Sequence, residues 1–110
     1  MTAQIKFPAD ALSAFTENSA DAPEQAARFL KSLAHRDRLK VLCVLLDNEL
    51  SVAAIEAQVG ASQSAISQHL GRLKDEGIVA RRRKGRQILY SISDPTARSL
   101  IEVLYLRFCS

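Results

Sequence analysis

Apolar residues recur at helical spacing along much of the chain. One helix is expected over about residues 23–33, with Pro23 suited to its first turn and Asp21 as a candidate cap. The preceding residues, 1–21, are predicted to form an N-terminal arm. A second helix is expected to begin at Asp37, and its apolar side chains cover nearly the whole circumference. This second helix is therefore predicted to be buried centrally.

Two shorter helices are expected next, joined by a turn that contains glycine. Ser51 is predicted to cap the first, which stops at Gly60, and Ser62 to cap the second, which Gly77 closes. Two helices joined in this way form a helix-turn-helix, which we assign to residues 51–76. The buried stripe of its second helix is predicted to consist of Ile66, Leu70 and Leu73.

The pattern then changes to that of a β-hairpin. Residues 78–80 and 88–92 have the composition of strands, and a glycine lies between them. We call the hairpin over residues 78–92 the wing. Apolar residues at helical spacing predict a last helix over residues 94–109. The predicted fold is mainly α with a small β-hairpin, a winged helix-turn-helix in a single domain over residues 1–110.

The composition is that of a globular protein, with 47% hydrophobic and 25% charged residues in a chain of 110. The longest uncharged apolar run, residues 41–46, is far shorter than the roughly 20 residues that span a bilayer. The first ten residues lack the basic and apolar regions of a secretory signal. We therefore expect a cytoplasmic protein.

Positive charge is concentrated in one third of the chain. Between residues 62 and 90, seven basic residues stand against two acidic ones, whereas the remainder carries eight basic and ten acidic residues. A strongly cationic segment on a slightly anionic body indicates a polyanionic partner. The alternative is that these charges only form a solvated face. The composition of the helix that follows Ser62 makes this alternative the weaker one.

The helix that follows Ser62 is predicted to be a DNA-recognition helix. Opposite its apolar stripe it carries short, uncharged hydrogen-bonding side chains and then a cation, where an ordinary exposed helix carries pairs of Glu and Lys. Glutamine can pair with an adenine edge, serine can bond to either base type, and arginine suits guanine or phosphate. The predicted DNA-contacting residues on this helix are Ser62, Gln63, Ser64, Ser67, Gln68 and Arg72.

The wing carries five cations around its glycine tip: Arg81, Arg82, Arg83, Lys84 and Arg86. Because successive side chains of a strand alternate between its two faces, these five cannot all contact DNA at once. We select Arg83, Lys84 and Arg86, which lie nearest the tip, as contacts to phosphates or to a minor groove. The other two are expected only to strengthen the local electric field.

These motifs resemble the ArsR/SmtB family of repressors over roughly residues 25–108. The resemblance lies in Leu33-Ala34-His35 with Arg38-Leu39, in Glu49-Leu50-Ser51-Val52, in the polar helix, and in the Gly85-Arg86 hairpin ending at Tyr90-Ser91-Ile92. It implies a winged-helix homodimer, joined through its first and last helices, that binds near-palindromic operator DNA and leaves it when an inducer binds. Arg36 departs from the family, which usually has proline at this position.

The metal-ligand patterns of this family are missing. The positions of its cysteine-bearing site are occupied by Ser51 and Ala53, and although Asp94 matches a second site, no histidine follows His69. Soft and borderline metals need sulfur or imidazole ligands. We therefore predict no metal site and no cofactor.

Two cysteines, Cys43 and Cys109, remain to be explained. By itself, Cys43 in an apolar helix is typical of a small core residue, and Cys109 is incidental. One cysteine in each of these helices, without a metal motif, resembles the dithiol branch of the family, which senses persulfides and polysulfides and represses sulfur-handling genes. The resemblance implies a redox pair of Cys43 and Cys109, with a general oxidant sensor and a metal or metalloid sensor as alternatives. Lys40, one turn before Cys43, favours Cys43 as the attacking thiolate, although the order of attack stays open.

An enzyme and a protein-interaction module are the other classes to weigh. The only histidines, His35 and His69, lie neither in a glycine-rich elbow nor beside paired carboxylates, so no catalytic residue is expected. His69 is predicted to pack or to contact phosphate, and His35 to help start a helix. An interaction module that has lost DNA binding is at odds with the intact polar helix and wing.

Overall fold

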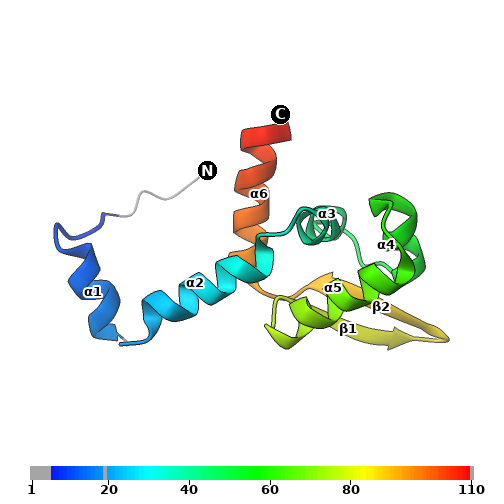
Figure 1. The fold of residues 1–110 in the computed structure, drawn as a ribbon, viewed down its shortest axis with the longest axis horizontal. Coiled ribbons are helices and arrows are strands. Elements are labelled where there is room, and N and C mark those ends of the chain that lie inside the picture. Colours follow the sequence, from blue (N-terminus) through cyan, green and yellow to red (C-terminus); the bar gives the residue numbers. More distant parts are fainter. Residues whose placement is uncertain (1–5, 19, 110) are drawn as a thin grey trace. The chain divides into compact units, whose positions relative to one another are not determined.

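The computed structural model describes residues 6–18 and 20–109, and it divides into two compact units, residues 1–31 and 32–110. The first unit contains α1 (Ala11–Asn18) and most of α2 (Ala22–Leu33) (Figure 1). A short helix thus forms within the predicted arm. The apolar side chains of this arm are largely exposed, as Phe7 and Leu12 show. Pro23 lies in the first turn of α2, as predicted.

The second unit holds the predicted helix-turn-helix, the wing and the last helix (Figure 1). Its elements are α3 (Arg36–Val44), α4 (Val52–Val59), α5 (Gln63–Asp75), β1 (Val79–Lys84), β2 (Gln87–Ile92) and α6 (Pro95–Cys109). This arrangement confirms the predicted winged helix-turn-helix. Across the described residues, no helix combines the length and the apolar character needed to cross a membrane.

Local hydrogen bonds define the ends of the helix-turn-helix. The Ser51 hydroxyl accepts a hydrogen bond from the backbone N–H of Ala54 at 3.2 Å, and the Ser62 hydroxyl accepts one from Ala65 at 3.1 Å. Both serines therefore cap their helices, as predicted. Gly60 ends α4 with a φ of 82°, in the left-handed region where a side chain would be strained.

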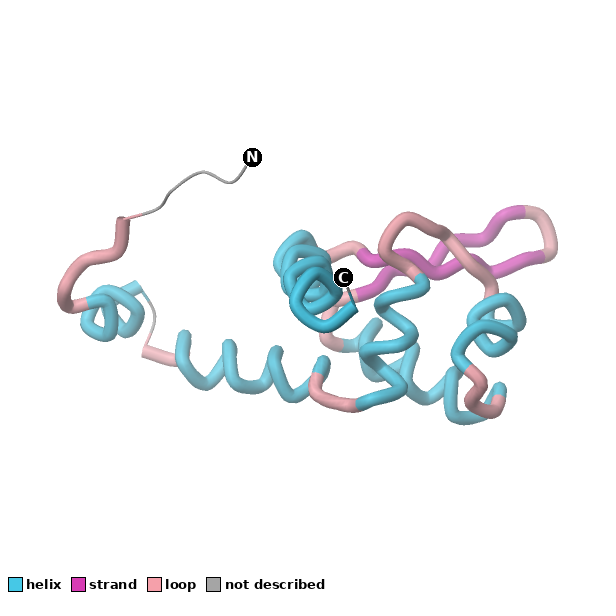
Figure 2. Tube along the Cα trace, turned by 90° about the horizontal axis from the view of Figure 1, so that it is seen from above, coloured by secondary structure: helices cyan, strands magenta, loops and turns pink. Residues whose placement is uncertain are grey.

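The wing is an antiparallel hairpin whose register runs from Val79 opposite Ile92 to Lys84 opposite Gln87. Its strands extend further toward the tip than the sequence indicated, because the cationic residues of β1 also pair with β2. Leu50 and Tyr90 exchange backbone hydrogen bonds of 3.0 and 2.8 Å, which join the wing to the segment before α4. In both views the tip projects beyond the helices of this unit (Figures 1 and 2).

The core of the second unit draws side chains from every element. α3 packs against α4, α5 and α6, which confirms its central position. The predicted stripe of α5 is fully buried. The fully buried or nearly buried apolar residues include Val41, Leu42, Leu45, Ile55, Ile66, Leu70, Leu73, Ile78, Val79, Ala97 and Ile101. The prediction that α3 is buried nearly all round is wrong on one side, where Cys43 is exposed.

Candidate DNA interface and thiol site

Helix α5 presents one polar, exposed face. Because its apolar stripe is buried against the core, the residues between the stripe positions point outward. The predicted contact residues all lie on this exposed side, namely Ser62, Gln63, Ser64, Ser67, Gln68 and Arg72. The face therefore offers hydrogen-bonding groups of the kind that read base edges in a major groove.

Four of the five cations of the wing fall into two groups. Arg83, Lys84 and Arg86 are exposed near the tip, and the Arg83 Nε–H donates a hydrogen bond of 3.1 Å to the carbonyl of Gly85. Arg82 instead donates two hydrogen bonds to the carboxylate of Glu49, at 2.6 and 2.7 Å. The Arg82 guanidinium thereby holds the pKa of Glu49 below its usual range.

Glu49 is a residue that the sequence interpretation did not assign to the site. Its partner Arg82 lies 33 positions away, and no local pattern links an acidic residue before α4 to one particular arginine of the wing. The Leu50–Tyr90 bridge explains why Glu49 meets Arg82, because it places the segment before α4 alongside the hairpin.

The two histidines lie together at the junction of α3 and α5. The His35 Nδ1 atom accepts a hydrogen bond from the backbone N–H of Asp37 at 3.1 Å, so His35 caps α3 and helps start it, as predicted. The ring of His69 is half-buried, with its centroid 4.6 Å from that of His35. Burial, then the nearby His35 and Arg38, lower the pKa of His69. The structure supports a packing role for His69.

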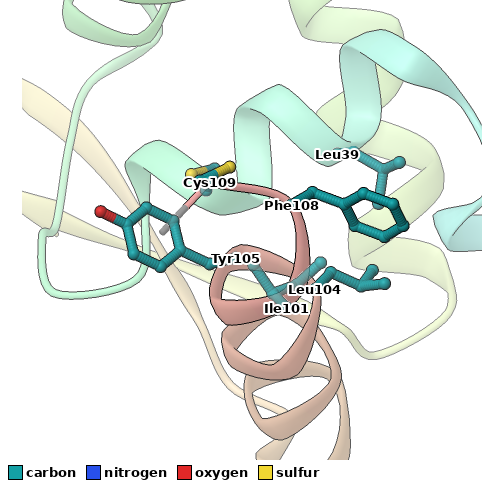
Figure 3. A pocket seen from close by; sticks show the side chains of 7 residues that line it. Leu39, Ile101, Leu104, Tyr105, Phe108 and Cys109 are labelled. Carbon is teal, nitrogen blue, oxygen red and sulfur yellow. The ribbon is translucent and has the colours of Figure 1, made fainter.

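The two cysteines are free thiols that line the same groove between α3 and α6. We call this cavity, of about 310 Å³, the thiol groove; its lining residues are Leu39, Cys43, Ile101, Leu104, Tyr105, Phe108 and Cys109. Figure 3 shows the labelled side chains of α6 that form one wall. Both thiols are exposed, so the expectation of a core cysteine at position 43 is wrong. α3 packs against α4, α5 and α6, and this packing leaves Cys43 exposed.

Comparisons with known proteins agree with this architecture. The family pattern described as "Bacterial regulatory protein, arsR family" matches residues 35–81. The chain is similar to the transcriptional activator HlyU of Vibrio cholerae, with 40% identity over 85 residues that cover 77% of this chain and 79% of that protein. It is also similar to the biofilm growth-associated repressor of Xylella fastidiosa, with 41% identity over 86 residues covering 78% and 75% of the two chains.

A solved structure of a relative has the same fold. The structure of reduced HlyU from Vibrio cholerae matches with a TM-score of 0.80 and 37% identity, and the match covers 86% of this chain and 99% of that one. Because this identity covers most of both chains, it indicates a shared family and not only a shared fold. The chain therefore belongs to the ArsR family of bacterial regulatory proteins and is a winged-helix, DNA-binding transcriptional regulator rather than an enzyme.

Proposed function

We propose that this protein is a cytoplasmic, homodimeric repressor that a persulfide or polysulfide releases from its operator through Cys43 and Cys109. The single observation that carries the proposal is the thiol groove. It brings two free, exposed cysteines from α3 and α6 to one apolar cavity, although they are far apart in the sequence. The relative HlyU has been solved in a form named as reduced.

In the proposed complex with DNA, α5 and the wing have different roles. The polar face of α5 suits a major groove, where Gln68 and Ser67 present short donors and acceptors to base edges. The exposed cations at the tip of the wing suit phosphates, which position the protein without reading sequence. Two copies of α5 in a symmetric dimer would contact half-sites about one turn of DNA apart, so a near-palindromic operator is expected.

Helix α6 carries the best candidate surface for dimerisation. Val103 is 59% exposed and Phe108 is 71% exposed, and they belong to an apolar run at the end of the helix. The exposed members of this run are Val103, Leu104, Tyr105, Leu106 and Phe108. Monomeric proteins rarely leave so many large apolar side chains together in water. We propose that α6 of a second copy covers this face.

The proposed reaction begins with one thiolate attacking the outer sulfur of a persulfide, RSSH. The S–S bond of RSSH breaks, RSH leaves, and the cysteine becomes a persulfide. The second cysteine then attacks the sulfur attached to the first residue, forms the disulfide and expels H₂S. The sum is two cysteine thiols plus RSSH giving a disulfide, RSH and H₂S. Each further RSSH inserts one sulfur into the bridge and leaves as RSH.

A bridge between the two cysteines in the thiol groove would couple the reaction with the inducer to a change in affinity for the operator. It would tie α3, which packs against α5, to α6, which carries the proposed dimer surface. A changed position of α6 relative to α3 would alter the distance between the two recognition helices of a dimer. Because the operator fixes that distance, the bridged dimer is expected to bind it less well.

The test compares the wild type with Cys43→Ser and Cys109→Ser on an operator that the reduced protein selects from genomic fragments. Glutathione persulfide should release the wild type, measured by fluorescence anisotropy. It should leave both variants bound, because a lone thiol cannot close a bridge. Ser99→Ala, an exposed position of α6, is the matched control and should respond like the wild type.

Intact mass spectrometry identifies the bridge. A disulfide lowers the mass of one chain by two hydrogens, and longer bridges add whole sulfur atoms to that value. Full release of the Cys109→Ser protein by persulfide would end the two-cysteine mechanism. Release by peroxide but not by persulfide would favour the general oxidant sensor. A loss of DNA binding with Zn²⁺ that a chelator reverses, and that Cys43→Ser abolishes, would favour a metal sensor.

A further inference from the structure

Three metal-ligating side chains meet at the junction between α3 and the recognition helix. One ligand atom each from His35, Asp37 and His69 lies within 4.8 Å of the other two. None of these residues belongs to the thiol groove or to the polar face of α5. The sequence indicated no such cluster, since all of α3 and α4 and the start of α5 lie between His35 and His69.

The backbone holds the three residues in place. His35 is the N-cap of α3, and because its Nδ1 accepts the hydrogen bond from Asp37, Nε2 is the nitrogen available to a metal. Asp37 lies in the first turn of the same helix. His69 comes from α5, which packs against α3. Helices α3 and α5 therefore supply Asp37 and His69, and the capping hydrogen bond fixes His35 at the start of α3.

The spacing is close to that of a metal centre. Ligand atoms around a tetrahedral Zn²⁺, with bonds of about 2.0–2.2 Å, lie roughly 3.3–3.6 Å apart. With either ring nitrogen of each histidine counted, the ligand atoms lie within 4.8 Å of one another, so the side chains must move closer to reach that separation. Two imidazoles and one carboxylate suit a borderline divalent ion, and three protein ligands leave one coordination position open.

Cations around the cluster oppose a bound metal. The Arg36 Nε atom lies 3.6 Å from Asp37 Oδ1 and competes for that carboxylate. Arg38 lies close enough to His69 to affect it electrostatically. These two positive charges are expected to weaken the binding of a metal cation. Arg36 is 83% exposed, so it can be removed without disturbing the core.

We propose that His35, Asp37 and His69 form a binding site for a divalent transition-metal ion, with Zn²⁺ as the best-fitting ion, which links the start of α3 to the recognition helix. The site differs from the two family sites considered in the sequence, and it uses no thiol. It is independent of the proposed persulfide switch. The alternative is that His35 serves only as a helix cap and His69 only as a packing residue.

The experiment uses the full chain without a histidine tag, in a Cys43→Ser/Cys109→Ser background that removes thiolate ligands. Zn²⁺ is titrated by calorimetry and by NMR of the imidazole nitrogens. Because the chain has two histidines, each imidazole signal has only two possible assignments. One bound ion per chain, a shift of both imidazoles and a higher Tm are expected.

Variants then locate the site. His69→Gln and His35→Asn should each weaken Zn²⁺ binding by at least about tenfold, since removing even a group that only supports a ligand costs that much. Asparagine keeps a capping acceptor at position 35. Asp37→Asn should weaken binding less, and Arg36→Ala should strengthen it. Asp75→Asn, an exposed carboxylate at the end of α5, is the matched control and should change nothing.

Two results would overturn the proposal. One is the absence of Zn²⁺ binding by the folded double-serine protein. The other is unchanged binding in His35→Asn and His69→Gln, with circular dichroism showing that both variants remain folded. Neither result bears on release by persulfide, which the cysteine variants test separately.

Discussion

Arg82 of the wing holds Glu49, the residue before Leu50, through two parallel hydrogen bonds, Nε to Oε2 at 2.6 Å and Nη2 to Oε1 at 2.7 Å. This fork-to-fork geometry is stronger and more directional than a single ion pair. Together with the bridge between Leu50 and Tyr90, it attaches the hairpin to the helix-turn-helix at adjacent points. Arg82 thus positions the wing, whereas the cations nearer the tip are the ones proposed to contact DNA.

Acid should loosen this attachment. The pKa of Glu49 is lowered, first by its hydrogen bonds to Arg82, so the stabilising effect is complete above the ordinary glutamate pKa of about 4.3. It is lost as the pH falls through the lower pKa of the folded state. NMR signals of the wing amides should therefore hold steady at pH values above the ordinary glutamate pKa and move only as the pH falls below it. In Glu49→Gln this transition should be absent, and its persistence there would assign it to another group.

Arg86→Ala should weaken binding to every DNA sequence. Each neutralised phosphate releases counterions, so the slope of log K against log salt should become shallower by roughly 0.9 for each phosphate that the variant no longer neutralises. Anisotropy titrations at several salt concentrations, with operator and random DNA, measure this effect. Weakening confined to the operator would show that Arg86 reads bases.

Gln68→Ala should weaken binding to the operator much more than binding to random DNA. It lies on the exposed face of α5, so its removal should cost about 1–3 kcal/mol on the operator and little on random DNA. The salt dependence should stay close to that of the wild type. Equal weakening on both DNAs would contradict the proposed division between α5 and the wing.

Val103→Asp should separate the proposed dimer without unfolding the chain. Val103 is 59% exposed, so a carboxylate costs little in a single copy, whereas in a covered α6 interface it would be buried without a partner. Sedimentation should show a shift toward monomer, and operator binding should weaken. The matched control is Ala57→Asp, an exposed position of α4, which should leave the oligomeric state unchanged. A dimer that survives Val103→Asp would place the interface elsewhere.

Ser51→Ala should remove about 1 kcal/mol of stability, because the variant has no hydroxyl to cap α4. Ser51→Asp keeps a capping oxygen and should retain most of that stability. Urea unfolding monitored by circular dichroism compares the variants. Equal destabilisation by both substitutions would indicate that packing, rather than the cap, makes position 51 important.

The elements of the second unit could be predicted from the sequence because their signals are local. The serine caps act on backbone groups three residues away, and Gly60 ends α4 through its own backbone conformation. The apolar stripe of α5 follows from the period of the helix. The same period placed the polar residues of α5 on the outside, so the candidate DNA-contacting face was also recognised.

Only the tertiary structure decided which distant side chains meet. The apolar pattern of α3 predicted burial on all sides, yet its partners α4, α5 and α6 leave Cys43 exposed. That same packing brings Cys43 and Cys109 to one groove and sets His35 beside His69. The pairing of Arg82 with Glu49 likewise depends on where the hairpin docks. Helical periodicity and capping are set within a few residues of the chain, whereas these contacts depend on how whole helices pack against one another.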